Sequence, residues 1–97
     1  MSYNVECPLC GKVNSMTQNT ERKCSKCSTD LYTDNDGNLR DAVVRHNPVL
    51  ANLKGLVIHK KRNEAEELLD TMLKRSQGKN HEVMIKVAED FYKFINS

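Results

Sequence analysis

The sequence predicts an α+β fold in which a small β-hairpin module, residues 1–40, precedes a three-helix segment, residues 41–97. Two observations predict this division. All four cysteines fall before residue 40, in a polar stretch with few apolar residues, whereas helical periodicity dominates from residue 41 onward. At 97 residues the chain has the size of one ordinary domain. This length excludes a large enzyme with a separate cofactor domain.

The cysteines of the first module form two CxxC pairs separated by 13 residues, close to the spacing of four-cysteine zinc sites. A tight turn aims both thiols of a pair at one point, and zinc binds four thiolates at about 2.3 Å each. The stretch between the pairs suits a short hairpin with its tip at residues 18–20. The predicted ligands of a structural zinc ion are therefore Cys7, Cys10, Cys24 and Cys27.

Other chemistry is open to the same four cysteines. Two disulfides would need an oxidising compartment, and we expect no export signal at the amino terminus. A thioredoxin-type redox site needs CxxC at the start of a helix, whereas residues 11–15 are polar and extended in pattern. Iron fits the same tetrahedral sulfur cage, which would make the protein an electron carrier. The spacing favours zinc and leaves iron open.

The CPxCG sequence at residues 7–11, followed by CxxC at residues 24–27, resembles a zinc ribbon. The resemblance covers residues 3–33 and implies two knuckle turns on a small β-hairpin, with a structural zinc ion held by the four cysteines. Rubredoxins are similar too, but they have a longer spacer and an aromatic-rich core. Ser28 departs from the ribbon pattern, because glycine commonly follows the second knuckle. A positive φ at Ser28 would cost about 1 kcal/mol.

The second module carries start and stop signals for three helices. Asn47 before a proline predicts the start of the first helix. Asn63 with Glu66 three residues later is typical of a capping box, which places the start of the second helix. Gly78 can take the left-handed conformation that ends many helices. The third helix is expected to begin near Asn80.

The third helix has an unusually wide apolar face. Its apolar residues cover an arc of about 200° at 100° per residue, more than one antiparallel neighbour covers. The helix is therefore expected either to lie centrally among several elements or to offer a surface to another chain. The side chains that would bind such a partner are Met84, Phe91, Tyr92 and Ile95. This face suggests a protein adaptor or inhibitor, or a homodimer.

The charge of the chain is nearly balanced, with 15 Lys and Arg against 13 Asp and Glu. Four thiolates and one Zn²⁺ would lower the formal net charge from +2 to zero. One dense basic cluster stands out, and its candidates for nucleic-acid contact are Lys60, Lys61 and Arg62. Cations near a helix carboxyl end are also favoured for helix stability alone. A helix-turn-helix over residues 48–76 is a further interpretation of this region.

The sequence offers no constellation for catalysis. It lacks a phosphate-cradling glycine loop, and no nucleophile, base and acid can be grouped from it, so we expect no enzymatic activity. No apolar run approaches the roughly 20 residues that span a bilayer, so we expect a cytoplasmic protein without a membrane partner. The leading hypothesis is a non-catalytic regulatory binding protein that engages transcription machinery or nucleic acid, which the zinc-ribbon resemblance implies by analogy.

Overall fold

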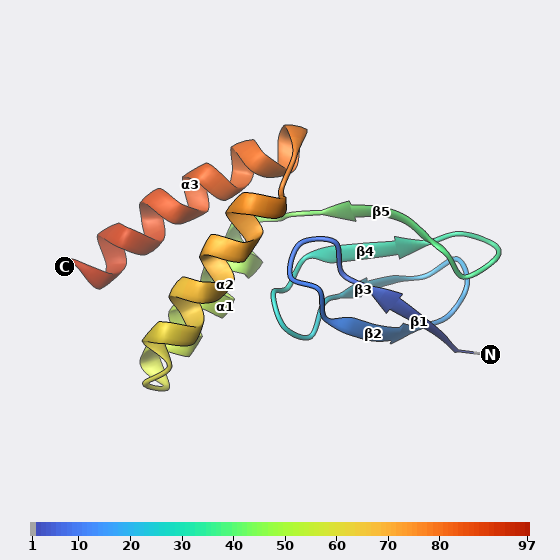
Figure 1. The fold of residues 1–97 in the computed structure, drawn as a ribbon, viewed down its shortest axis with the longest axis horizontal. Helices are drawn as coiled ribbons and strands as arrows, with labels where there is room; N and C mark the ends of the chain where they lie inside the picture. The colour runs from blue at the N-terminus through green and yellow to red at the C-terminus, as the bar shows by residue number, and fades with distance from the viewer. Residues whose placement is uncertain (1) are drawn as a thin grey trace.

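The computed structural model describes residues 2–97 and confirms the α+β class. Strands gather at the end of the molecule that carries the N-terminus, and helices form the end that carries the C-terminus (Figure 1). The overall dimensions are 45 × 28 × 19 Å. The elements are β1 (Tyr3–Glu6), β2 (Val13–Met16), β3 (Glu21–Lys23), β4 (Asp30–Thr33), β5 (Leu39–Val43), α1 (His46–Ile58), α2 (Arg62–Arg75) and α3 (Gly78–Ile95).

The strands form two antiparallel sheets, one of β1 and β2 and one in the order β3-β4-β5. The prediction of a single hairpin between the two cysteine pairs is therefore wrong, because β2 and β3 belong to different sheets. Each CxxC turn instead connects the two strands of its own hairpin, β1 to β2 and β3 to β4. The predicted tip at residues 18–20 is the passage between the sheets, where Asn19 N–H donates to the carbonyl of Asp34 at 3.0 Å.

β5 carries the sheet past the predicted module boundary at residue 40. It pairs with β4, with Asp30 opposite Val43 and Leu31 opposite Ala42, so the last strand of the sheet leads directly into α1. The buried apolar residues form one cluster that contains members from both ends of the molecule, such as Leu31 and Phe91.

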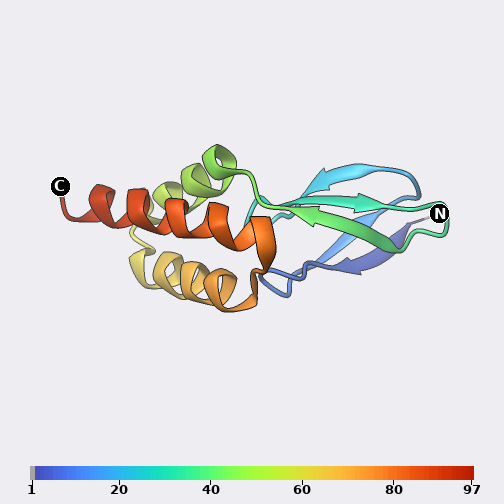
Figure 2. The same cartoon turned by 90° about the horizontal axis from the view of Figure 1, so that it is seen from above.

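The three predicted helices are present, with shifted starts. α1 and α2 run antiparallel as a helical hairpin, and α3 lies between them in the view of Figure 2. The turn between α1 and α2 is tight because Lys60 adopts a left-handed φ of 63°. This side-by-side packing differs from the crossed pair of a helix-turn-helix, so that reading is wrong.

The capping-box prediction for α2 is also wrong. The helix begins at Arg62 with Lys61 at the N-cap position and no side-chain cap hydrogen bond, so Asn63 lies within the first turn. The chain re-enters a helix directly after left-handed Lys60, which leaves no extended residue for a capping side chain. Gly78 has the expected positive φ, 58°, but it does not end α2, whose C-cap residue Ser76 is extended. Gly78 instead opens α3, two residues before Asn80.

The central position of α3 explains its wide apolar face. Met84, Val87 and Phe91 are fully buried. The prediction that Met84 and Phe91 bind a partner is wrong, because both side chains are buried in the core beneath α3. Tyr92 is 45% exposed, and Ile95 is partly buried against the core.

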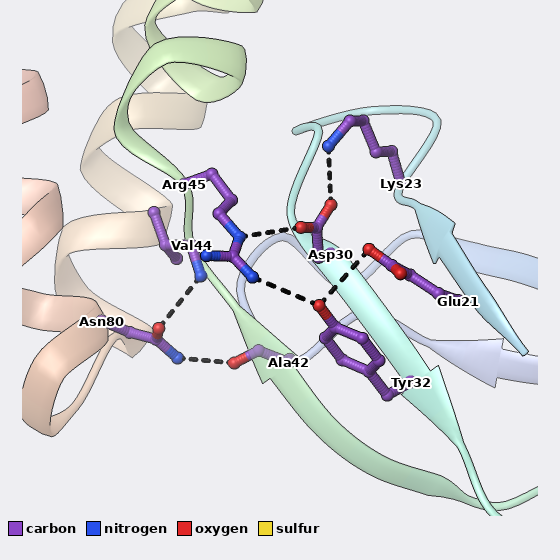
Figure 3. A network of polar contacts seen from close by, with 8 residues as sticks. All are labelled: Glu21, Lys23, Asp30, Tyr32, Ala42, Val44, Arg45 and Asn80. Atoms are coloured by element: carbon purple, nitrogen blue, oxygen red, sulfur yellow. Dashed lines mark hydrogen bonds and ion pairs between the residues drawn. The ribbon is translucent and has the colours of Figure 1, made fainter.

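Polar side chains at two places in Figure 3 join the strands to the helices. Asn80 of α3 accepts a hydrogen bond from Val44 N–H at 3.0 Å and donates to the carbonyl of Ala42 at 2.7 Å. At the entry to α1, Arg45 contacts the buried carboxylate of Asp30 at 3.0 Å. The side chain of Asn80 thus continues the edge of the sheet, and Arg45 holds the first turn of α1 against β4.

Asp30 stays charged although its side chain is only 4% exposed. Burial opposes its ionisation, but hydrogen bonds from Lys23 at 2.7 Å and from Arg45 outweigh that effect and lower the pKa of the carboxyl. Tyr32 extends the network, because its hydroxyl lies 3.3 Å from Glu21 and 3.4 Å from Arg45.

No helix within residues 2–97 has both the length and the apolar character that a bilayer crossing requires.

Candidate metal centre

The first cysteine pair lies in the turn between β1 and β2. Cys7 N–H donates to the carbonyl of Lys12 at 2.8 Å, and Gly11 N–H donates to the carbonyl of Cys7 at 2.8 Å. Gly11 has a φ of 82°, a conformation that glycine adopts without the Cβ clash of other residues. The two hydrogen bonds fold the CPLCG segment into a tight knuckle with both thiols on its inner side.

The second pair lies in the turn between β3 and β4 and repeats the same pattern. Cys24 N–H donates to the carbonyl of Thr29 at 2.8 Å, and Ser28 N–H donates to the carbonyl of Cys24 at 3.0 Å. Ser28 takes the place of Gly11 and has a φ of 66°. The expected strain at Ser28 is therefore present, and the second knuckle keeps its geometry in spite of it.

The two knuckles face each other and bring the four sulfur atoms together. All four Sγ atoms lie within 4.8 Å of one another. The distances across the knuckles are 3.6 Å from Cys7 to Cys27 and 3.5 Å from Cys10 to Cys24. A tetrahedral ion with bonds of about 2.3 Å needs sulfur atoms about 3.8 Å apart, so the four cysteines fit zinc with small adjustments. Iron would fit the same sulfur cage.

Three of the four cysteines are shielded from solvent. Cys7 and Cys27 are fully buried and Cys24 is 2% exposed, while Cys10 is partly exposed. A metal ion held here would have a complete shell of four protein ligands. Such an ion cross-links the two knuckles and offers no position to water or substrate. A zinc ion bound here would thus have a structural role.

The thiols perturb one another strongly. Hydrogen bonding with Cys10 is the main cause that lowers the pKa of Cys7, to about 7. The same partner lowers the pKa of Cys24 and raises that of Cys27, and hydrogen bonding with Cys24 raises the pKa of Cys10. Protons shared in this way keep four negative charges from coexisting. A divalent ion removes that constraint, so metal binding releases protons and strengthens as the pH rises.

A residue that the sequence analysis missed connects the two knuckles. Asn14 on β2 is 3% exposed. Its Nδ2 donates to Cys24 Sγ at 3.4 Å and to the carbonyl of Lys12 at 3.1 Å, and its Oδ1 accepts from Ser25 N–H at 3.0 Å. The sequence does offer a signal for Asn14, which stands two residues before the apolar residue Met16. Alternate residues of a strand face the same side, so Asn14 is expected to point inward with Met16.

Thr29 is the second missed residue. It is fully buried directly after the second knuckle, and its hydroxyl lies 3.1 Å from Cys27 Sγ. When Cys27 is a thiolate, the hydroxyl can donate a hydrogen bond to it and offset part of its negative charge.

The other predicted site residues lie elsewhere. Lys60 and Lys61 lie in the turn between α1 and α2, and Arg62 is the first residue of α2. All three are exposed, at the end of the helical hairpin that points away from the strands (Figure 1), and together they are called the basic turn. Tyr92 and Ile95 lie near the far end of α3. The fold therefore brings the four cysteines together and keeps them separate from the basic turn and from the exposed part of α3.

Comparisons of the chain with protein-family models, curated proteins and solved structures find no match. The centre is accordingly assigned from its own geometry, as a four-cysteine cluster with the spacing and burial of a metal site.

Proposed function

We propose that this protein is a non-catalytic binding protein in which a structural zinc ion organises the strands and the basic turn between α1 and α2 contacts nucleic acid. The observation that carries the proposal is the closed cluster of four cysteine sulfur atoms, all within 4.8 Å of one another. A metal with four protein ligands stabilises a fold and leaves the binding of partners to the rest of the surface. Engagement of transcription machinery is the role that the zinc-ribbon resemblance adds.

The exposed basic turn supports nucleic acid as the partner. Lys60 and Lys61 form no ion pair with any residue in the 2–97 range. Arg62 contacts Glu66 at 3.4 Å, in a pair that is exposed on both sides and therefore contributes little to stability. Three cations at the tip of a helical hairpin can reach phosphate oxygens without reading base sequence.

The test is the salt dependence of binding to a 20-base-pair DNA duplex and a 20-nucleotide RNA, measured by fluorescence anisotropy on the zinc-loaded protein. Replacing Lys60, Lys61 and Arg62 together by alanine should reduce the slope of log K against log salt by about two to three. A triple variant at Lys79, Lys86 and Lys93 removes the same charge from α3 and should leave that slope near the wild-type value. Equal losses in both variants, or no binding of either probe at low salt, would refute the nucleic-acid role.

A protein adaptor or homodimer is the second candidate function. Ile85 and Tyr92 are 43% and 45% exposed, and their spacing of seven residues places them on the same side of α3. Two exposed apolar side chains in line can contact a partner helix. Analytical ultracentrifugation of the wild type and of Ile85→Asp with Tyr92→Asp tests self-association. A wild-type monomer at high micromolar concentration rules out the homodimer.

A further inference from the structure

One cysteine of the metal centre differs from the other three in its access to solvent. Cys7, Cys24 and Cys27 are buried, whereas Cys10 is only partly buried. Cys10 also lines a cleft of about 680 Å³ between the two knuckles and the helical hairpin of α1 and α2. A reagent from solution therefore has a route to Cys10 that the other three cysteines lack.

The walls of this cleft come from both ends of the molecule. The second knuckle lines one side with Ser25 and Lys26, and α1 and α2 line the other. Asn52 of α1 donates a hydrogen bond to the carbonyl of Lys26 at 2.7 Å, which ties the second knuckle to the helices. The volume of the cleft lies in the range of small-ligand sites, so a small organic molecule can enter it.

The sulfur atom of Cys10 has a reaction partner on the opposite knuckle. Cys10 Sγ and Cys24 Sγ are 3.5 Å apart. A disulfide has an S–S bond of about 2.05 Å, so the two atoms have to approach each other by only about 1.5 Å. Cys7 Sγ and Cys27 Sγ are almost as close, at 3.6 Å, but both side chains are fully buried. Access from solution therefore favours the pair of Cys10 and Cys24.

We propose that Cys10 is a site of reversible oxidation by hydroperoxides and that the product is a disulfide between Cys10 and Cys24. This site depends on the proposed zinc ion, which would hold both sulfur atoms as thiolates, the form of cysteine that oxidants attack. The disulfide would join the same two knuckles that the ion joins. It would also remove two of the four ligands, so the ion is released.

The reaction balances in two steps. The Cys10 thiolate attacks the terminal oxygen of the hydroperoxide, the O–O bond breaks, and Cys10 becomes a sulfenic acid while an alkoxide, or hydroxide from hydrogen peroxide, leaves. The Cys24 thiolate then attacks the Cys10 sulfur, the S–S bond forms, and the S–O bond breaks with loss of hydroxide. The two sulfur atoms lose two electrons in all, and the hydroperoxide takes them up. A thiol reductant reverses the product by disulfide exchange.

The experiment treats the zinc-loaded protein with one equivalent of hydrogen peroxide and then blocks the remaining thiols with iodoacetamide. Trypsin, which cuts after Lys26 and so separates Cys24 from Cys27, prepares the peptides for disulfide mapping by mass spectrometry. The first disulfide should join Cys10 to Cys24, and a zinc-sensitive dye should record one zinc ion released per disulfide. Dithiothreitol with added zinc should restore the starting protein. A first disulfide within either knuckle or between Cys7 and Cys27, or no disulfide at all, would overturn the proposal.

Two single variants provide the matched control. Cys10→Ser and Cys7→Ser each leave three thiols, but only Cys7→Ser keeps the pair of Cys10 and Cys24. Hydrogen peroxide, and the bulkier tert-butyl hydroperoxide, should release zinc severalfold more slowly from Cys10→Ser than from Cys7→Ser. Equal rates in the two variants would refute the role of Cys10. If either variant does not bind zinc, the disulfide map of the wild type decides the question.

The zinc content before oxidation distinguishes failure of this oxidation site from failure of the proposed metal centre. One bound zinc ion per chain with a different first disulfide would refute only the oxidation of Cys10. A chain that binds no zinc would refute the metal centre and the oxidation site together. Neither result bears on the nucleic-acid role of the basic turn, which its own variants test.

Discussion

The buried amide of Asn14 is the residue that joins the two halves of the metal centre. It contacts Cys24 Sγ and the carbonyl of Lys12, and it accepts a hydrogen bond from Ser25 N–H. Groups that orient metal ligands in this way commonly change metal affinity by a factor of about 10–100. The position of one thiol thus depends on a side chain from the opposite hairpin.

Replacing Asn14 by alanine should weaken zinc binding by about 10–100-fold, because Cys24 and Ser25 lose their contacts with β2. Competition with a chromophoric chelator measures the affinity directly. Asn4→Ala is the matched control, since Asn4 is an exposed residue of β1. An affinity within about twofold of the wild type for Asn14→Ala would mean that the knuckles hold Cys24 without help.

Ser28 is strained by its backbone conformation. Its φ of 66° is equivalent to that of Gly11 in the first knuckle. A left-handed conformation costs a residue with a Cβ about 1–2 kcal/mol relative to glycine. The second knuckle therefore has a local conformational free-energy cost that the first knuckle, with Gly11, avoids.

Ser28→Gly should raise the free energy of unfolding of the zinc-loaded protein by about 1 kcal/mol. Ser28→Ala should leave it nearly unchanged, since alanine keeps the Cβ. Urea denaturation of both variants checks the difference. If glycine and alanine gave the same stability, strain at Ser28 would be relieved in some other way.

At the scale of elements, two asparagines near the starts of helices have different roles. Asn63 lies inside the first turn of α2 and makes no capping hydrogen bond. Asn80 lies in the first turn of α3 and bonds the carbonyl of Ala42 in β5 and the N–H of Val44 directly after that strand. The contact of Asn80 replaces a missing strand neighbour and fixes α3 to the sheet.

Asn80→Ala should therefore cost about 1–3 kcal/mol of stability, because Val44 N–H and the carbonyl of Ala42 lose their partner. Asn63→Ala should change stability by less than about 0.5 kcal/mol. Thermal denaturation of the two zinc-loaded variants compares them on equal terms. A larger loss for Asn63→Ala would restore the capping-box interpretation of α2.

At the scale of the whole molecule, the strands and the helices depend on different sources of stability. The hairpins meet around the four sulfur atoms, and several of their strand residues are exposed. The helices pack on one another around Leu53, Leu69 and Phe91, all of which are fully buried. Strands cross-linked by the proposed metal ion and helices held by apolar burial should respond differently to a chelator.

Removal of the metal with excess chelator should disorder residues 3–33 while most of the helical circular dichroism remains. The reason is that zinc binding supplies about 10–16 kcal/mol to sites of this kind, comparable with the whole stability of a small domain. NMR signal dispersion of the strands, together with far-ultraviolet ellipticity, follows the two parts separately. Simultaneous loss of both signals would mean that the shared apolar cluster makes the molecule a single cooperative unit.

The sequence by itself determined the parts of this protein that depend on local spacing. The two CxxC pairs predicted the sulfur cluster, apolar periodicity predicted three helices, and Ser28 was correctly expected at a position that favours glycine. These features follow from turn geometry and from the 3.6-residue repeat, both of which act within a few residues along the chain.

Only the tertiary structure decided which surfaces face each other. Strand pairing set each knuckle in its own hairpin, and the position of α3 between α1 and α2 placed Met84 and Phe91 in the core. Asn14 reached the second knuckle because residues of different hairpins meet only after packing. The wide apolar arc of α3 was consistent with burial and with partner binding, since periodicity records that a face is apolar and not what covers it.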